Sequence, residues 1–313
     1  MSLQRFVVFS FLCTLLYGLR EKTLRIGADA AVSFSDAFHP YWGEKNIRSL
    51  NEGQTVQLSL DQNSGSGFAS NDQFLYGYFG MQMKLVPGDS AGTLTSFYLS
   101  SKLNDWDQHD EVDFEFLGNV SGQPYILQTN VFTGGKGGRE QRIYLWFDPT
   151  AAHHWYSIMW NRDTIVFWVD AMPIRSFKNN SDLGVPYLSK RPMALYSSMF
   201  DASTWATRGG LVGIDWTKGP FVSSYTGFTV MGCKVDKQIE YIDSPDLPCH
   251  FSLTSKWDHL ASIPQSNFGS TDALQRQLVK WVPDEIMIYD YCKDSKRYPK
   301  QPVECTRNEQ LLN

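Results

Sequence analysis

Apolar and polar residues alternate along much of the chain between residues 55 and 230. The clearest runs are Val56–Leu60, Phe79–Leu85, Val112–Phe116 and Ile143–Phe147. A period of two indicates strands with one buried face. Turn clusters rich in glycine, such as residues 63–67 and 134–138, separate these runs, as is typical of an antiparallel sandwich. The pattern therefore predicts an all-β body.

The start of the chain follows a different pattern. Residues 6–17 are almost wholly apolar, follow Arg5 and precede a charged segment at residues 20–22. This arrangement indicates a signal peptide over residues 1–22, because a membrane-spanning helix needs ~20 apolar residues. A buried N-terminal strand is the alternative. No later stretch approaches that length, so we expect a secreted protein that has left the membrane once the signal is removed.

The last third of the chain carries the cysteines and loses the alternation. The change falls near residue 227, and one helix is predicted over Thr271–Val282, ended by Pro283. If Cys13 leaves with the signal peptide, four cysteines remain: Cys233, Cys249, Cys292 and Cys305. An even set in a secreted chain favours two disulfides. Local pairing would join Cys233 to Cys249 and Cys292 to Cys305, one of three connectivities. A zinc site is disfavoured because the paired spacing of its ligands is missing.

Charge and composition narrow the class of partner. The chain has 313 residues, 28 Lys and Arg against 33 Asp and Glu, and a formal charge of −5, so nucleic acid is an unfavourable partner. Aromatic residues make up 14%, which suits either a β core or platforms for sugar rings. Sequons at Asn119 and Asn179 agree with secretion and predict glycosylation there.

The most informative stretch is an acidic strand over residues 109–118. Glu111, Asp113 and Glu115 share one of its faces. The two glutamate Cα atoms would lie ~13 Å apart, and inward-leaning side chains could bring the carboxyls to the ~5 Å of a retaining glycosidase. Repulsion among three acids would hold one of them protonated, as a general acid requires.

Competing interpretations of the polar motifs remain open. The acidic face could simply be solvated, while a calcium loop fails because His109 and Asp110 stand where the EF-hand needs an acid or amide and then glycine. Gly88–Gly92 fits the Gly-x-Ser-x-Gly pattern of serine hydrolases, but that elbow must open a helix. Residues 93–99 predict a strand instead, so we expect Ser90 to lie in a plain turn.

Several motifs together resemble the plant xyloglucan endotransglucosylase/hydrolases of glycoside hydrolase family 16. The motifs are residues 81–92, the acidic strand with the sequon after it, residues 125–132, 141–149, 205–210 and 289–292. The resemblance implies an antiparallel β-jelly-roll sandwich of the concanavalin-like kind over residues 23–226. It also implies a C-terminal extension over residues 227–313 that carries two disulfides and a short helix.

The resemblance also assigns roles to individual residues. Glu111 stands at the position of the family's nucleophile, Glu115 at that of its general acid/base, and Asp113 at that of the helper between them. Positions implied to bind sugar are Gln128, Asn130, Arg142, Phe200, Trp205, Gly210, Tyr289 and Arg297. No metal or other cofactor is implied.

The chain departs from the family pattern mainly on the acceptor side. Phe200 stands where the family usually has a tryptophan that stacks on the acceptor sugar, and a smaller ring should stack less strongly. Residues 201–204 also differ from the usual sequence, Asn46 replaces a common histidine, and the segment at residues 102–108 is longer than usual. Pro283 interrupts a tail segment that usually has no proline. These changes bear on acceptor choice.

These observations lead to three functional hypotheses. The first is a secreted retaining enzyme that cuts the xyloglucan backbone in the cell wall or apoplast, as a monomer, and passes the new end to another xyloglucan chain or to water. The second is a non-catalytic polysaccharide-binding module on the same fold, because sandwich folds serve both purposes. The third is a structural wall protein. The acidic trio favours the first, because a binding module has no need of it.

Overall fold

The computed structural model describes residues 32–101, 107–170, 172–239, 242 and 286–308. The strands are β1 (Phe38–Trp42), β2 (Ile47–Leu50), β3 (Thr55–Leu60), β4 (Ser66–Lys84), β5 (Thr93–Ser100), β6 (Glu111–Leu117), β7 (Ile126–Phe132), β8 (Gln141–Tyr144), β9 (His154–Trp160), β10 (Thr164–Val169), β11 (Met172–Lys178), β12 (Met193–Asp201), β13 (Phe221–Val235) and β14 (Met287–Asp290). The helices are α2 (Phe34–Ala37), α4 (Cys305–Asn308) and the 3-10 turns η1 (Glu44–Asn46), η2 (Ser181–Leu183), η3 (Thr207–Gly210), η4 (Trp216–Lys218) and η6 (Tyr291–Lys293).

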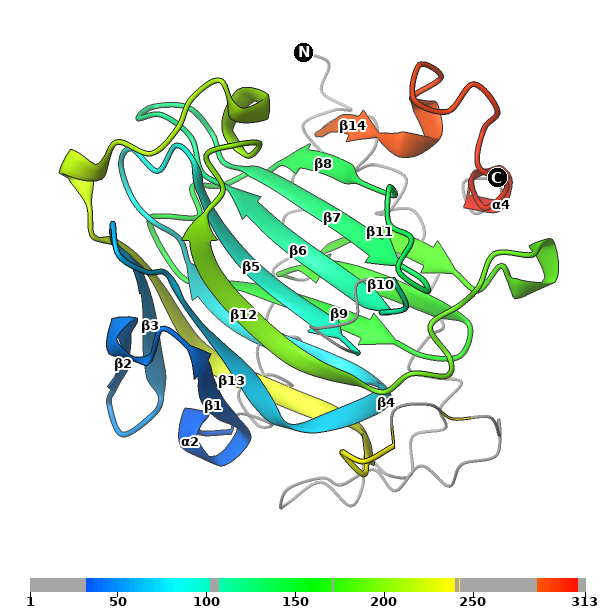
Figure 1. Ribbon diagram of the computed structural model, residues 1–313, viewed down its shortest axis with the longest axis horizontal. Coiled ribbons are helices and arrows are strands. Elements are labelled where there is room, and N and C mark those ends of the chain that lie inside the picture. Colours follow the sequence, from blue (N-terminus) through cyan, green and yellow to red (C-terminus); the bar gives the residue numbers. More distant parts are fainter. Residues whose placement is uncertain (1–31, 102–106, 171, 240–241, 243–285, 309–313) are drawn as a thin grey trace, which may run out of the picture.

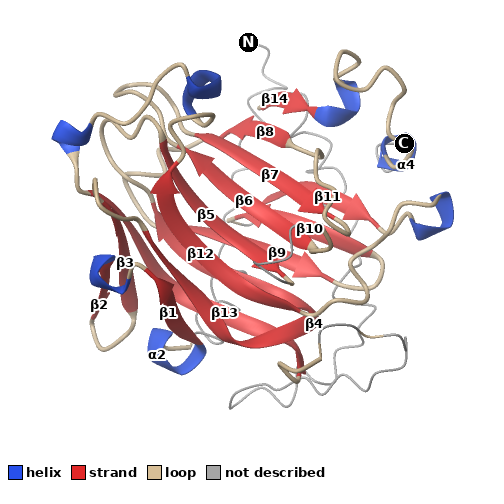
Figure 2. Ribbon diagram, in the orientation of Figure 1, coloured by secondary structure: helices blue, strands red, loops and turns tan. Residues whose placement is uncertain are grey.

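The strands form two antiparallel layers that share the long strand β4. The front layer has the order β1-β4-β12-β5-β6-β7-β8-β14, and the back layer has the order β2-β3-β13-β4-β9-β10-β11. The first half of β4 pairs with β12 and its second half with β9. Figures 1 and 2 show the front sheet lying over β9, β10 and β11, with only short helices around it.

The change of layer within β4 occurs at Tyr76 and Gly77. Tyr76 has a φ of +71°, which is uncommon outside glycine. A side chain at Gly77 would bring a Cβ atom within 2.4 Å of the Met231 carbonyl oxygen on β13. Glycine therefore lets the two backbones meet at the corner where one strand serves both sheets.

The predicted alternation places the core between the layers. Val56, Leu58 and Leu60 are at most 2% exposed, and the same holds for the inward positions of β4 and β6. The antiparallel all-β body is thus confirmed, although β8 ends at Tyr144 and the predicted run continues as irregular chain. Leu145 and Phe147 still pack against the core.

The Gly-x-Ser-x-Gly motif does not open a helix. The strand β5 follows it, as predicted, and Ser90 is 1% exposed. The Ser90 hydroxyl accepts a hydrogen bond from the Asn119 backbone N–H at 3.1 Å. Ser90 therefore stabilises a turn, and this segment does not form a hydrolase elbow.

The C-terminal extension joins the edge of the front sheet through β14. Cys292 and Cys305 form a disulfide, which confirms this half of the predicted pairing. Cys233 is buried in β13, while Cys13, Cys249 and the helix predicted over residues 271–282 lie outside the described residues. The strand β13 runs through residue 227, where the sequence places a domain boundary. Chain on both sides of that position therefore belongs to one strand.

Several contacts bind the extension to the segment before β8. Arg139 Nε donates to Glu304 Oε1 at 2.8 Å, and the Tyr298 hydroxyl donates to the Gly138 carbonyl at 2.6 Å. The Tyr291 N–H donates to the Glu140 carbonyl. The described part of the extension is thus held against the loop that leads into β8. Among the described residues, no helix is long and apolar enough to cross a membrane.

Candidate active site

The acidic strand β6 lies inside the front sheet, between β5 and β7. Its inward residues contact the back layer: the Phe114 ring lies 5.2 Å from that of Phe167 on β10, and the Phe116 ring lies 4.7 Å from that of Tyr156 on β9. Since side chains alternate along a strand, the three acids face the opposite way, onto the outer face of the front sheet. The prediction that they share one face is confirmed.

Neighbouring strands place polar side chains beside Asp113 and Glu115. Tyr98 on β5 and Asn130 on β7 lie directly opposite Asp113. Ser96 and Gln128 lie opposite Glu115 in the same way. Beyond Gln128 the row continues through Arg142 on β8 to Tyr289 on β14. The row follows from register, because directly paired residues of an antiparallel sheet point to the same side.

A chain of hydrogen bonds runs outward from Glu115. Gln128 Nε2 donates to Glu115 Oε2 at 2.5 Å, and Arg142 Nε donates to Gln128 Oε1 at 2.6 Å. The Arg142 guanidinium lies over the Tyr289 ring, 5.4 Å from its centroid. Three of the sugar-binding positions that the resemblance implies therefore form one row that begins beside Glu115.

Burial changes the acidity of Glu115. It raises the pKa of this carboxyl from 4.5 to about 7, with the charge of Glu111 acting in the same direction. The hydrogen bond from Gln128 and the charge of Arg142 work against this rise. A carboxyl that titrates near neutrality can hold a proton and release it, which is what a general acid/base must do.

Asp113 and Glu111 share a hydrogen bond that divides their roles. Burial, then the charges of Glu111 and Glu115, raise the pKa of Asp113 well above its ordinary range, so this carboxyl holds a proton. Burial raises the pKa of Glu111 overall, and the charge of His109 and the hydrogen bonds with Ser100 and Asp113 limit this rise. The protonated Asp113 thus favours the ionised form of Glu111, as an attacking carboxylate requires.

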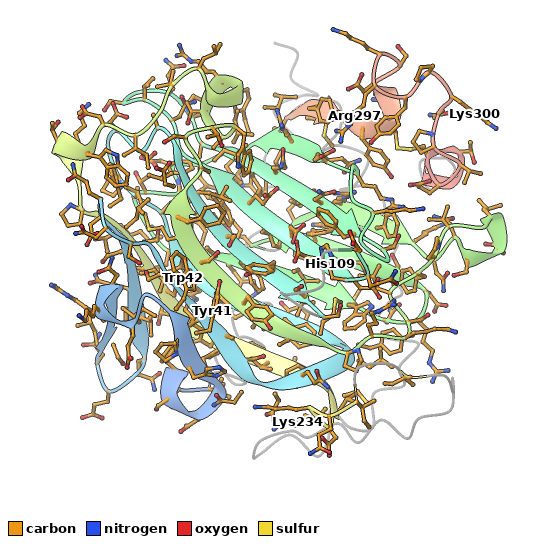
Figure 3. The ribbon with its side chains drawn as sticks, viewed as in Figure 1. Tyr41, Trp42, His109, Lys234, Arg297 and Lys300 are labelled. Carbon is orange, nitrogen blue, oxygen red and sulfur yellow. A yellow bond between two sulfur atoms is a disulfide. The ribbon has the colours of Figure 1, made fainter. Side chains whose placement is uncertain are left out.

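His109 is a site residue that the sequence reasoning missed. Its Nε2 lies 3.9 Å from Glu111 Oε2, its side chain is 1% exposed, and its ring lies 5.0 Å from the ring of Phe132. The sequence could have revealed it, because residue 109 is an even number of positions from each of the three acids, and alternation places such residues on the same face. Figure 3 shows His109 on the face of the front sheet.

Three tyrosines on the other side of the acids were also missed. The Tyr98 and Tyr196 rings stack at 5.2 Å, and the Tyr41 ring meets that of Tyr196 edge-on at 5.6 Å. The hydroxyls of Tyr41 and Tyr98 lie 3.3 Å apart. Tyr41 and Trp42, labelled in Figure 3, belong to β1. Sequence alternation could not reveal this cluster, because β1, β5 and β12 are far apart in the chain.

The remaining sugar-binding candidates lie at the borders of the acidic face. Phe200 packs against a buried cluster formed by Leu94, Leu117, Ala202 and Ala206. Trp205 is 37% exposed in the segment after β12. Gly210 has a φ of +87°, and a Cβ atom there would lie 2.2 Å from the Thr204 carbonyl oxygen, so glycine is needed for the turn. These three residues lie outside the row formed by Glu115, Gln128, Arg142 and Tyr289.

Asn130 and Arg297 make contacts within the protein. The Asn130 side-chain carbonyl accepts backbone N–H bonds from Val131 and Arg139. Arg297 donates to both carboxylate oxygens of Glu140, at 2.6 and 3.3 Å, near the Tyr289 hydroxyl. Figure 3 places Arg297 beside β14. The ion pair with Glu140 therefore holds Arg297 beside Tyr289, at the border of the acidic face.

The sequons lie on loops of the sandwich. Asn119 follows β6, and its Nδ2 donates to the Pro124 carbonyl at 3.0 Å. Asn179 follows β11, and its Nδ2 donates to the Arg162 carbonyl at 2.9 Å. Both side chains are partly accessible, which leaves glycosylation a prediction for each.

Two family models match the chain. The model of glycosyl hydrolases family 16 matches residues 34–218. The model of the xyloglucan endo-transglycosylase C-terminus matches residues 257–305. The first range includes the acidic strand and the second includes β14.

Relatives and solved structures agree with these matches. Xyloglucan endotransglucosylase protein 34 of Populus tremula x Populus tremuloides is 48% identical over 304 residues, which cover 97% of each chain. Xyloglucan endotransglucosylase/hydrolase protein A of Phaseolus angularis is 50% identical over 280 residues, 90% of each chain. A prokaryotic beta-1,3-1,4-glucanase from a mouse hindgut metagenome is 22% identical with a TM-score of 0.50, covering 63% of this chain and 95% of its own. The last likeness confirms the jelly-roll fold.

Proposed function

This chain belongs to the xyloglucan endotransglucosylase/hydrolases of glycosyl hydrolase family 16, and we propose that Glu111, Asp113 and Glu115 carry out its reaction. The substrate is xyloglucan, as donor and as acceptor. The observation that carries the assignment of roles is the acidity of the trio: one carboxyl titrates near pH 7 and another donates a hydrogen bond to the third. On a solvated acidic face, the three carboxyls would have similar pKa values and would all be ionised at neutral pH.

In the first step Glu111 attacks the anomeric carbon of a glucose unit in the donor backbone. A bond forms between the Glu111 oxygen and this carbon, the glycosidic bond breaks, and the departing oxygen takes the proton of Glu115. Asp113 keeps its own proton and its hydrogen bond to Glu111. The product is a covalent glycosyl-enzyme and a released chain end.

In the second step an acceptor hydroxyl replaces the enzyme. Glu115, now ionised, takes the proton of that hydroxyl while its oxygen bonds to the anomeric carbon and the Glu111 carboxylate departs. A sugar hydroxyl gives transfer and water gives hydrolysis. Gln128 and Arg142 support this step, because their hydrogen-bond chain fixes the Glu115 carboxyl.

The biological setting follows from the same proposal. The signal peptide over residues 1–22 would send the protein into the cell wall and apoplast, where xyloglucan is found. Asn119 and Asn179 would carry glycans, and the protein would act as a monomer. Cys233 would pair with Cys249, so that two disulfides hold the extension over residues 227–313 to the sandwich over residues 23–226.

The test is to incubate the secreted protein with xyloglucan and labelled xyloglucan oligosaccharides, following polymer size and label incorporation. Label entering polymer is the expected result for wild type, and Glu111→Ala should abolish it while far-UV circular dichroism stays unchanged. A Glu111→Ala protein with normal activity refutes the assignment of the nucleophile. Saturable binding by a wild-type protein that neither transfers nor cleaves would favour the polysaccharide-binding module.

A further inference from the structure

The outer face of β8 continues past Arg142 as two exposed aromatic residues. Ile143 is buried, and Leu145 and Phe147 pack against the core. By alternation within β8, Tyr144 shares the side of Arg142, which is the side of the acids. Trp146 lies two residues beyond the end of the strand, exposed between Leu145 and Phe147. The exposed fractions of Tyr144 and Trp146 are 41% and 40%, so both rings are open to solvent. The sequence and the family resemblance assign them no role.

Tyr144 ends a row of apolar residues that crosses the front sheet. The residues paired directly across β12, β5, β6, β7 and β8 are Phe200, Leu94, Leu117, Ile126 and Tyr144. Leu94 and Leu117 are each 2% exposed, and Phe200 and Ile126 pack against them. This row lies one step beyond the row of Glu115 and Gln128. Ala202 and Ala206 belong to the same buried cluster, so the middle of the row is covered, and Tyr144 is its exposed end.

The direction of the strands brings these residues to one edge. In Figure 1 the arrows of β12, β6 and β8 point to the same edge of the front sheet. Phe200, Leu117 and Tyr144 stand at or near the ends of those strands, and the segment with Trp205 leaves β12 at the same edge. Aromatic surface is thus available on both sides of the apolar row, while Phe200 is itself half-buried within it.

We propose that Tyr144 and Trp146 form a further binding site for the acceptor chain, which takes sugar units remote from the reacting hydroxyl. The inference rests on the proposed function, in which Glu115 protonates the leaving chain and later activates the acceptor on this side. The C–H faces of pyranose rings pack on aromatic rings, and the Tyr144 hydroxyl can bond a sugar hydroxyl. Two residues of chain span at most roughly 7 Å, so the Tyr144 and Trp146 rings are close enough for both to contact one extended sugar chain.

The site compensates for the partly buried ring of Phe200. Less of that ring is open to stack on an acceptor than an exposed tryptophan would offer, whereas the rings on β8 are open to solvent. Because the contacts lie beyond Arg142, they reach only acceptors long enough to extend past it. Tyr144 and Trp146 therefore favour long acceptors over short ones.

The experiment compares labelled acceptors with one and two repeat units of the xyloglucan backbone. Tyr144→Ala and Trp146→Ala should each raise KM for the longer acceptor by about three- to ten-fold and leave KM for the shorter one within about two-fold. Tyr144→Phe, which keeps the ring, should retain most of the affinity. Leu50→Ala is the matched control, since Leu50 is 40% exposed on β2 in the back layer.

Two results overturn the proposal: an unchanged KM for the longer acceptor, or equal changes for both lengths. A binding measurement separates this failure from that of the proposed function. Calorimetry on Glu111→Ala protein gives Kd for the longer oligosaccharide, and adding Trp146→Ala should raise it by a similar factor. If wild type transfers no label, the proposed function fails, and an unchanged Kd in the double variant would refute the site as well.

Discussion

Replacing Glu115 by glutamine should change how stability depends on pH. The unfolded chain releases this proton near pH 4.5, whereas the folded protein keeps it until about pH 7. Between these values the folded state binds more protons, so the free energy of unfolding falls as pH rises. At roughly 1.4 kcal/mol per pH unit, and allowing for the partial exposure of Glu115, the loss is about 2 to 3 kcal/mol.

Glu115→Gln removes that loss because the amide does not titrate, and its oxygen can still accept the hydrogen bond from Gln128. The variant should therefore gain about 2 to 3 kcal/mol relative to wild type between pH 4.5 and pH 7.5. Urea unfolding followed by tryptophan fluorescence at both pH values measures the difference. Glu44→Gln, a change at an exposed position, is the control and should follow wild type.

The outcome that would refute this reasoning is a pair of parallel curves. If wild type and Glu115→Gln lose the same free energy between pH 4.5 and pH 7.5, the folded protein does not hold a proton on Glu115 in that range. The general-acid role would then need another source of the proton.

Three further changes test the surroundings of the site. Arg142→Met removes a charge that lowers the pKa of Glu115, so the basic limb of the kcat/KM profile should move to higher pH; movement to lower pH would contradict the role of the charge. Arg175→Met leaves the Thr129 hydroxyl and a backbone carbonyl without their buried donor, and urea unfolding should show a loss of about 2 to 4 kcal/mol, whereas a change below about 0.5 kcal/mol would count against it. Replacing Cys292 and Cys305 by alanine should lower the free energy of unfolding by about 3 kcal/mol, since the disulfide spans 13 residues; equal stability of the reduced and oxidised wild type would oppose this.

Local pattern was enough to predict the strands that carry the site. Alternation placed Glu111, Asp113 and Glu115 on one face and Val112, Phe114 and Phe116 on the other, and the structure has this arrangement. A period of two is a property of the single strand and needs no knowledge of its partners. For the same reason it also indicated which side of β8 is buried.

Long-range pairing was beyond the reach of that pattern. Alternation does not reveal that β4 turns from one layer to the other at Tyr76, because the bend depends on the backbones of β9 and β13 meeting it. It also does not reveal that Arg175 spans the core to bond Thr129, since charged residues are normally placed on surfaces. Both features depend on strands that are distant in sequence.

The candidate site was predicted in part for similar reasons. Gln128, Arg142 and Tyr289 came from the family resemblance, and the structure joins them in one row beside Glu115. Tyr98 and Tyr196 carry no motif of their own, so only the pairing of β5 with β12 could show that they stack.

The protonated Asp113 has a consequence for the electrostatics of the whole reaction. In the proposed reaction, the three side chains together bear one negative charge before the first step, on Glu111. Attack neutralises that oxygen as an ester while Glu115 becomes anionic, so the charge is relocated along β6 and its total does not change. The return step moves it back. In this mechanism, a strand whose other face is packed with phenylalanine therefore has to accommodate only a single anion at any stage.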